Sequence, residues 1–166
     1  MPWVGGIVVP RVVQLSGSVG GTGSLNATIT VVPYPTRLLE ITRRLREGGE
    51  YTVSVITSIM ACEVATERAL SAAFKANKLE HIEDAVNEFM NGHVLNNDRH
   101  RKLYNALTGD AIEQEPFWGR WKQAAELRNK IIHGSTQATA QEAEGANIAA
   151  DEFVSHMMKR TAKGGP

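Results

Sequence analysis

The sequence predicts an all-α protein, an up-and-down helical bundle that carries a short β-hairpin or extended arm at its N-terminus. The residue pattern changes near Pro33-Tyr34-Pro35, where β-branched, partly alternating residues give way to apolar residues at three- and four-residue steps. A chain of 166 residues with 42% hydrophobic and 22% charged side chains is typical of one folded domain with a buried core. We therefore assign residues 1–34 to a β-rich arm, 35–161 to a helical domain and 162–166 to a flexible tail.

The N-terminal segment has the composition of a hairpin. β-Branched runs at 6–9 and 12–15 precede the glycine- and serine-rich stretch 16–24, which can supply a flexible turn, and a further run at 27–32 follows it. Pro10 favours an edge or bulged strand, because proline has no amide hydrogen to donate to a ladder. An isolated hairpin is marginal in water, so we expect it to pack on the helices, pair with another subunit or stay mobile.

Two helices should open the helical domain. Thr36 can cap a helix over 36–46, and a longer helix is expected over 51–76, where apolar and small residues recur at helical spacing. Small residues allow a partner helix to approach closely, so we interpret the longer helix as the centre of the core. Cys62, the only cysteine, lies in its apolar pattern and is interpreted as a packed core thiol.

Several titratable residues of this region are candidates for catalytic groups or metal ligands. Glu63 and Glu67 lie one helical turn apart and could act as paired carboxylates, but helical carboxylates usually face solvent. His81, His93 and His100 have spacings that do not place a compact pair of metal ligands on one helical face. Surface positions or internal hydrogen bonds are the simpler prediction for these histidines, and we expect no metal or other cofactor.

The second half of the domain should contain further helices. One apolar stripe predicts a core-facing helix, formed by Leu79, Ile82, Val86, Phe89 and Met90. A short helix is expected over 103–107, and Pro116 fits the first turn of a helix that carries Trp118 and Trp121. The two tryptophans could stack on bases, but their helical spacing favours a packing role. The sequence 139–142, Thr-Ala-Gln-Glu, has the form of a capping box and starts a final helix.

The segment 128–134, Arg-Asn-Lys-Ile-Ile-His-Gly, combines an arginine, an amide and a histidine where a helix should end. Arginine binds phosphate and histidine exchanges protons near neutral pH, so together they could hold and cleave a phosphodiester. On a regular helix Arg128 and His133 diverge by roughly 140°. Convergence requires the helix to loosen near His133, with Gly134 in the left-handed conformation that closes many helices. Alternatively, the histidine only interacts with the negative end of the helix dipole.

Residues 118–134, followed by a small-polar linker and an alanine-rich helix, resemble the C-terminal half of a HEPN domain. In that family an Arg, usually followed by Asn, and then a His lie at the junction of the last two long helices. Arg128, Asn129 and His133 match this pattern, and the helical layout agrees over about residues 36–160. The resemblance implies a homodimer whose two motifs face one another in a shared cleft. For active members it implies metal-independent RNA cleavage by attack of the 2′-hydroxyl, with His133 as general acid/base, Arg128 stabilising phosphate charge and Asn129 orienting the phosphate oxygens.

Two functions stay open from the sequence. One is an endoribonuclease, such as a toxin or defence ribonuclease, which the presence of both Arg128 and His133 favours. The other is a non-catalytic HEPN-like module for dimerisation or for binding a nucleotide or protein partner. Eighteen basic residues balance 18 acidic ones, so nothing in the net charge attracts nucleic acid. This balance favours the non-catalytic module.

The expected partners follow from the same resemblance. They are a second copy of the chain, RNA or a nucleotide phosphate, and a neutralising protein or nucleotidyltransferase. The lone cysteine suits a reducing compartment, and no apolar run approaches the roughly 18 residues of a membrane-spanning helix. The N-terminus lacks a basic start before its apolar stretch. We therefore predict a cytoplasmic protein without a membrane partner.

Overall fold

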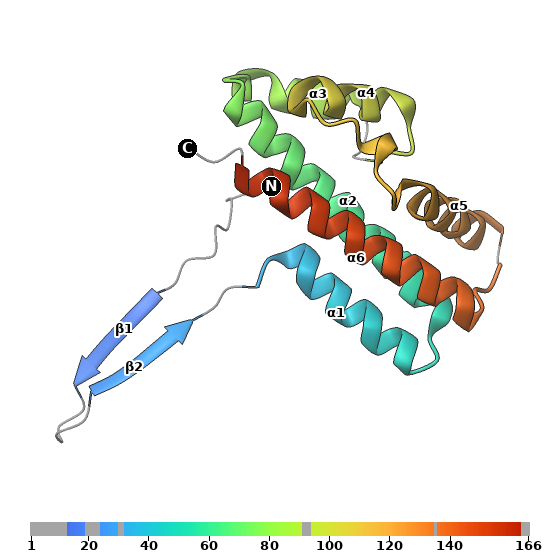
Figure 1. The fold of residues 1–166 in the computed structure, drawn as a ribbon, viewed down its shortest axis with the longest axis horizontal. Coiled ribbons are helices and arrows are strands. Elements are labelled where there is room, and N and C mark those ends of the chain that lie inside the picture. Colours follow the sequence, from blue (N-terminus) through green and yellow to red (C-terminus); the bar gives the residue numbers. More distant parts are fainter. Residues whose placement is uncertain (1–12, 19–23, 30–31, 91–93, 135, 164–166) are drawn as a thin grey trace. The chain divides into compact units, whose positions relative to one another are not determined.

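The computed structural model describes residues 13–18, 24–29, 32–90, 94–134 and 136–163. The chain divides into two compact units, Met1–Pro33 and Tyr34–Pro166 (Figure 1). The first unit contains an antiparallel hairpin of β1, Val13–Ser18, and β2, Ser24–Ile29.

The hairpin register places Val13 opposite Ile29 and Ser18 opposite Ser24. Both strands therefore extend into the stretch 16–24 that the composition assigned to a turn. Pairing between the strands satisfies backbone hydrogen bonds whatever the side chains are, and it outweighs the low strand propensity of glycine. Residues 6–10, with the first predicted run and Pro10, lie outside the described residues.

The second unit is an all-α bundle, as predicted. Its helices are α1 (Tyr34–Glu47), α2 (Tyr51–Ala76), α3 (Glu80–Met90), α4 (Asp98–Thr108), the short 3-10 helix η1 (Ile112–Gln114), α5 (Trp118–Gly134) and α6 (Ala140–Lys163). Figure 1 shows α6 in front of α2, with α1 and α5 on either side and α3 and α4 at one end. No helix in the described part of the chain is long and apolar enough to cross a membrane.

Helix ends are set by short local signals. The predicted capping box at the start of α6 is confirmed, because the Thr139 amide donates to Glu142 Oε2 at 2.8 Å and the Glu142 amide donates to Thr139 Oγ1 at 3.2 Å. At the start of α4 the Arg99 amide donates to the Asn97 side chain. The same helix ends at Gly109, whose φ of 66° lies in the left-handed region that glycine adopts without strain.

The core lies between α2 and α6, where small residues let the backbones approach. Buried alanines recur on both helices, at Ala61, Ala65 and Ala69 on α2 and at Ala143, Ala146 and Ala150 on α6. Trp121 of α5 stacks on Phe153 of α6 with ring centroids 4.8 Å apart, so its predicted packing role is confirmed.

Cys62 is buried as predicted, and burial raises the pKa of its thiol, which keeps it protonated.

The prediction that the α3 stripe faces the core is wrong. None of the residues of α3 is buried, and Phe89 is 80% exposed. Periodic apolar spacing identifies an amphipathic helix but does not identify what covers its apolar face. Here α3 packs against the bundle only weakly, and Phe89 remains on the surface.

Candidate functional site

Helix α5 positions the three residues of the predicted motif. Trp121, Ala124, Ala125 and Ile131 are its buried residues, so Arg128 lies at the edge of the buried face. The helix continues through His133 to Gly134. Among the described glycines only Gly49 and Gly109 have positive φ. The expected loosening at His133 and left-handed Gly134 are therefore wrong, because α5 keeps its helical conformation to its last residue.

Arg128 and Asn129 line a cavity of about 380 Å³ between α2, α5 and the start of α4. The Arg128 Nη1 donates to Asn129 Oδ1 at 3.2 Å, and Nη2 lies 3.6 Å from Glu63 Oε1. The buried Arg128 Nε has no hydrogen-bond partner in the described part of the chain. The guanidinium is therefore held by Asn129 and Glu63, and only its Nη groups, which carry further hydrogens, can donate to a ligand in the cavity, because Nε is enclosed by protein.

Glu63 is the only carboxylate that lines this cavity among the described residues. Burial raises the pKa of its carboxyl above the ordinary value, and the Arg128 charge offsets part of this rise. Glu67, one turn further along α2, is exposed. The two residues do not form a pair of buried carboxylates, and Glu63 instead acts as the counter-charge of Arg128.

His100 also lines the cavity, but both of its ring nitrogens are occupied. Nε2 lies 2.7 Å from the Met90 carbonyl, and Nδ1 lies 3.2 Å from the Val94 amide. The ring thus ties the start of α4 to the preceding segment, which confirms an internally hydrogen-bonded histidine. His81 is exposed, and His93 lies outside the described residues.

His133 does not line the Arg128 cavity, and its side chain is exposed. Because α5 is regular, His133 leaves the helix roughly 140° away from Arg128 but on the same face as Asn129. The structure brings Arg128 and Asn129 together at the cavity and leaves His133 on the surface, one turn beyond Asn129. Within one chain, the arginine and the histidine do not converge.

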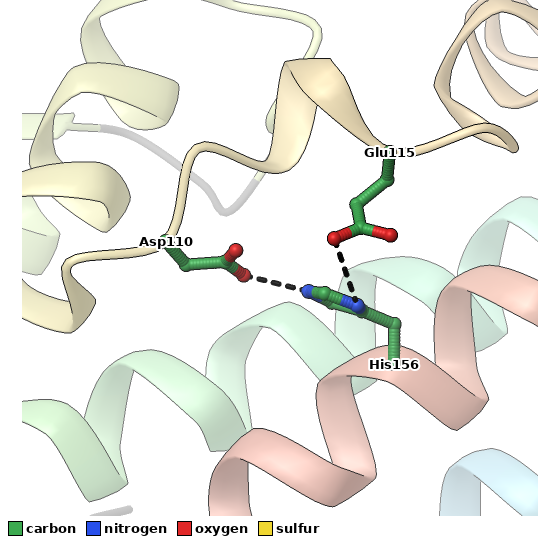
Figure 2. A group of neighbouring side chains, drawn as sticks. All are labelled: Asp110, Glu115 and His156. Atoms are coloured by element: carbon green, nitrogen blue, oxygen red, sulfur yellow. Dashed lines mark hydrogen bonds and ion pairs between the residues drawn. The ribbon is translucent and has the colours of Figure 1, made fainter.

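A second polar cluster, which the sequence analysis missed, joins the connection after α4 to α6. Asp110 is 3% exposed and accepts hydrogen bonds from Tyr104 Oη at 2.8 Å, His156 Nε2 at 2.6 Å and Arg160 Nη2 at 2.8 Å. On the other side of the imidazole, His156 Nδ1 lies 3.9 Å from Glu115 Oε1 (Figure 2). The aspartate and the histidine thus form a tightly held dyad.

The electrostatics of this cluster follow from its contacts. Burial raises the pKa of Asp110, but the hydrogen bonds from His156 and Tyr104 and the nearby positive charges outweigh it, so the pKa lies below its ordinary value. Burial and the Asp110 contact raise the pKa of the Tyr104 phenol. The spacing of His156 and Arg160, four residues apart on one helix, was the available sequence signal. Nothing in the sequence indicates that Asp110 folds onto them.

Comparisons with known protein families, curated proteins and solved structures found no match. The HEPN assignment therefore stays a prediction from the motif and the helical layout.

Proposed function

We propose that this chain is a HEPN-like, metal-independent endoribonuclease that works as a homodimer. The observation that carries the proposal is the cavity beside the C-terminal half of α5, where Arg128 and Asn129 both contribute to the lining and lie in hydrogen-bond contact with one another. His133 is exposed one turn further along, close to the connection between α5 and α6.

The chemistry assigns one role to each residue. The Arg128 guanidinium stabilises charge that develops on the phosphate oxygens, and Asn129 orients these oxygens. His133 exchanges protons with the attacking 2′-hydroxyl and with the leaving 5′-oxygen. The requirement for a 2′-hydroxyl makes RNA the substrate and excludes DNA.

A second copy is required because Arg128 and His133 of one chain point in different directions. The surface next to the cavity offers apolar side chains for such a contact. Ile132, 47% exposed, lies one turn after Arg128 on α5, and Met60, 42% exposed, lies three residues before Glu63 on α2. A two-fold contact that covers them would place both motifs near the symmetry axis and supply two histidines, one as base and one as acid.

The second candidate is a non-catalytic HEPN-like module that holds a nucleotide phosphate or a protein partner at Arg128. The separation of His133 from Arg128 within one chain favours this alternative. The zero net charge at 18 basic and 18 acidic residues also provides no general attraction to RNA.

The test is incubation of the purified protein with labelled RNA, with and without a chelator, beside RNA that carries a 2′-deoxy nucleotide at each cut site. We expect cleavage that the chelator leaves unchanged, products with a 2′,3′-cyclic phosphate, and resistance of the deoxy substrate. Absence of cleavage of any RNA, together with Arg128-dependent nucleotide binding, would support the non-catalytic module instead.

A further inference from the structure

Helix α3, at one end of the bundle, presents an apolar strip to solvent (Figure 1). Phe89 is 80% exposed and Ile82 is 38% exposed. Seven residues separate them, which is about two helical turns, so both side chains lie on one side of the helix, with the exposed Ala85 between them. Val86 and Met90, on the neighbouring side, are half-buried. The bundle therefore covers one edge of the apolar side of α3 and leaves the other edge open.

The open edge is bordered by negative charge. Helix α3 carries four carboxylates, Glu80, Glu83, Asp84 and Glu88, and His81 is its only basic residue. In the described part of the chain none of the four forms an ion pair.

Glu88 is in an unfavourable position for an acidic residue. It lies in the last turn of α3, where the negative end of the helix dipole repels a carboxylate, and this turn contains no basic residue. Asp84 lies one turn earlier on the same side of the helix. Both carboxylates thus lack a counter-charge next to the exposed apolar strip.

We propose that α3 is the docking surface for a basic amphipathic helix of another protein. Apolar side chains of the partner cover Ile82 and Phe89, and its lysines or arginines pair with Asp84 and Glu88. An α-helix of 11 residues is about 16 Å long, which suits one partner helix of three turns. A contact of this size is typical of a transient complex that one aromatic anchor dominates.

The charge of α3 decides between this partner and the other candidates for an apolar strip. A second α3 from another copy would bring four more carboxylates against the first four. An anionic lipid surface and the RNA backbone are repelled for the same reason. A basic helix is the partner for which the apolar contact and the charge contact both favour binding.

The docking surface lies next to the Arg128 cavity. His100, which lines that cavity, has its Nε2 2.7 Å from the carbonyl oxygen of Met90, the last residue of α3. The imidazole thus fastens the end of α3 to the wall of the cavity. A partner on α3 stands beside this cavity whatever reaction takes place there, so the proposal does not rest on ribonuclease activity.

The test uses a labelled synthetic peptide of lysine and leucine, spaced so that the leucines share one helical face, and the purified full chain. Fluorescence anisotropy should give a dissociation constant of about 10–100 µM at low salt, and binding should weaken several-fold when the salt is raised to about 0.3 M. Phe89→Ser should weaken binding by about tenfold, because the aromatic anchor is lost. Asp84→Asn combined with Glu88→Gln should weaken it several-fold and reduce its salt dependence.

Matched control variants carry the same changes elsewhere on the surface. Ile148→Ser removes an apolar side chain of α6 that is 48% exposed. Glu67→Gln combined with Glu126→Gln removes two exposed carboxylates, on α2 and α5. Both variants should bind the peptide like the wild type, and circular dichroism should show that all variants keep the helical signal.

Four results would overturn the proposal. The first is no binding of the peptide up to about 1 mM, and the second is unchanged affinity in Phe89→Ser. The third is equal binding of a glutamate and leucine peptide with the same spacing, which would exclude charge complementarity. The fourth is equal binding of a shuffled lysine and leucine peptide without an apolar face, which would indicate charge attraction alone. None of these results depends on RNA cleavage.

Discussion

Arg128 has to serve two partners, the Glu63 carboxylate that is already present and the phosphate that we propose as its ligand. The two compete, because a phosphate close to the guanidinium is repelled by a carboxylate whose oxygen lies 3.6 Å from Nη2. Burial raises the pKa of the Glu63 carboxyl, and the charge of Arg128 offsets part of this rise. Sequence analysis identified both residues but gave no means of placing them against one another.

Replacement of this carboxylate tests the competition. Glu63→Gln should bind a non-cleavable 2′-deoxy RNA on the order of three- to tenfold more tightly, because the repulsion of the phosphate is removed and screening limits the gain at this partly exposed site. Fluorescence anisotropy measures the affinity. Glu67→Gln, an exposed carboxylate one turn away, should leave it unchanged; weaker binding by Glu63→Gln would contradict a phosphate at Arg128.

Asp110 makes the stability of the bundle depend on acid. Its pKa in the folded chain lies below its ordinary value, so its contribution to the free energy of unfolding is complete above about pH 4 and is lost as the pH falls through the folded pKa. Asp110→Asn should lower the stability at neutral pH by roughly 3 kcal/mol, because Arg160 and His156 lose their buried counter-charge. It should also flatten the decline below pH 4.

Urea unfolding at a series of pH values checks this expectation. Glu142→Gln is a useful comparison, since the pKa of Glu142 is also lowered, by hydrogen bonds from Thr139 in the exposed capping box. Its effect on stability should be much smaller. If the free energy of unfolding falls equally steeply with pH below pH 4 in the wild type and in Asp110→Asn, Asp110 is not the cause of the acid dependence.

At the scale of elements, local signals explain most of the success of the sequence analysis. The long helix α2 has the predicted bounds of 51–76, and Thr139 with Glu142 starts α6. These features depend on neighbouring residues. The errors at α3 and at the end of α5 concern what a helix packs against and how the next segment leaves it, which depend on distant parts of the chain.

The exposure of α3 leads to a comparison of two phenylalanines. Phe89→Ser should change the free energy of unfolding by less than about 0.5 kcal/mol, since the ring is 80% exposed. Phe153→Ala on α6 should cost about 3–5 kcal/mol, because this ring is fully buried and stacks on Trp121. Urea unfolding of both variants supplies the measurement. A large decrease in the free energy of unfolding of Phe89→Ser would contradict the exposed position of Phe89 and would instead indicate that this ring is buried.

At the scale of the whole molecule, the proposal requires two copies. Light scattering at micromolar concentration should give the mass of a dimer. Met60→Glu combined with Ile132→Glu should shift it to a monomer, because both exposed apolar side chains would become charged next to the Arg128 cavity. Ile148→Glu, a residue of α6 that is 48% exposed, is the matched control and should remain dimeric. A monomeric wild type would contradict a shared cleft.

The all-α fold could be predicted from the sequence because the spacing of apolar residues along the chain distinguishes helices from strands. The candidate site could be predicted only in part. The motif identified Arg128, Asn129 and His133, but whether the arginine and the histidine converge depends on the conformation of Gly134 and on a second copy of the chain, neither of which a single sequence specifies.

The most direct measurement of the central claim is the rate of RNA cleavage by His133→Ala beside His81→Ala. His81 is an exposed histidine on α3 outside the proposed site, so its replacement controls for the loss of a surface imidazole. If His133 transfers protons, His133→Ala should retain the helical signal and lose on the order of 100-fold or more in cleavage rate, whereas His81→Ala should cleave like the wild type. Undiminished cleavage by His133→Ala would contradict the catalytic assignment.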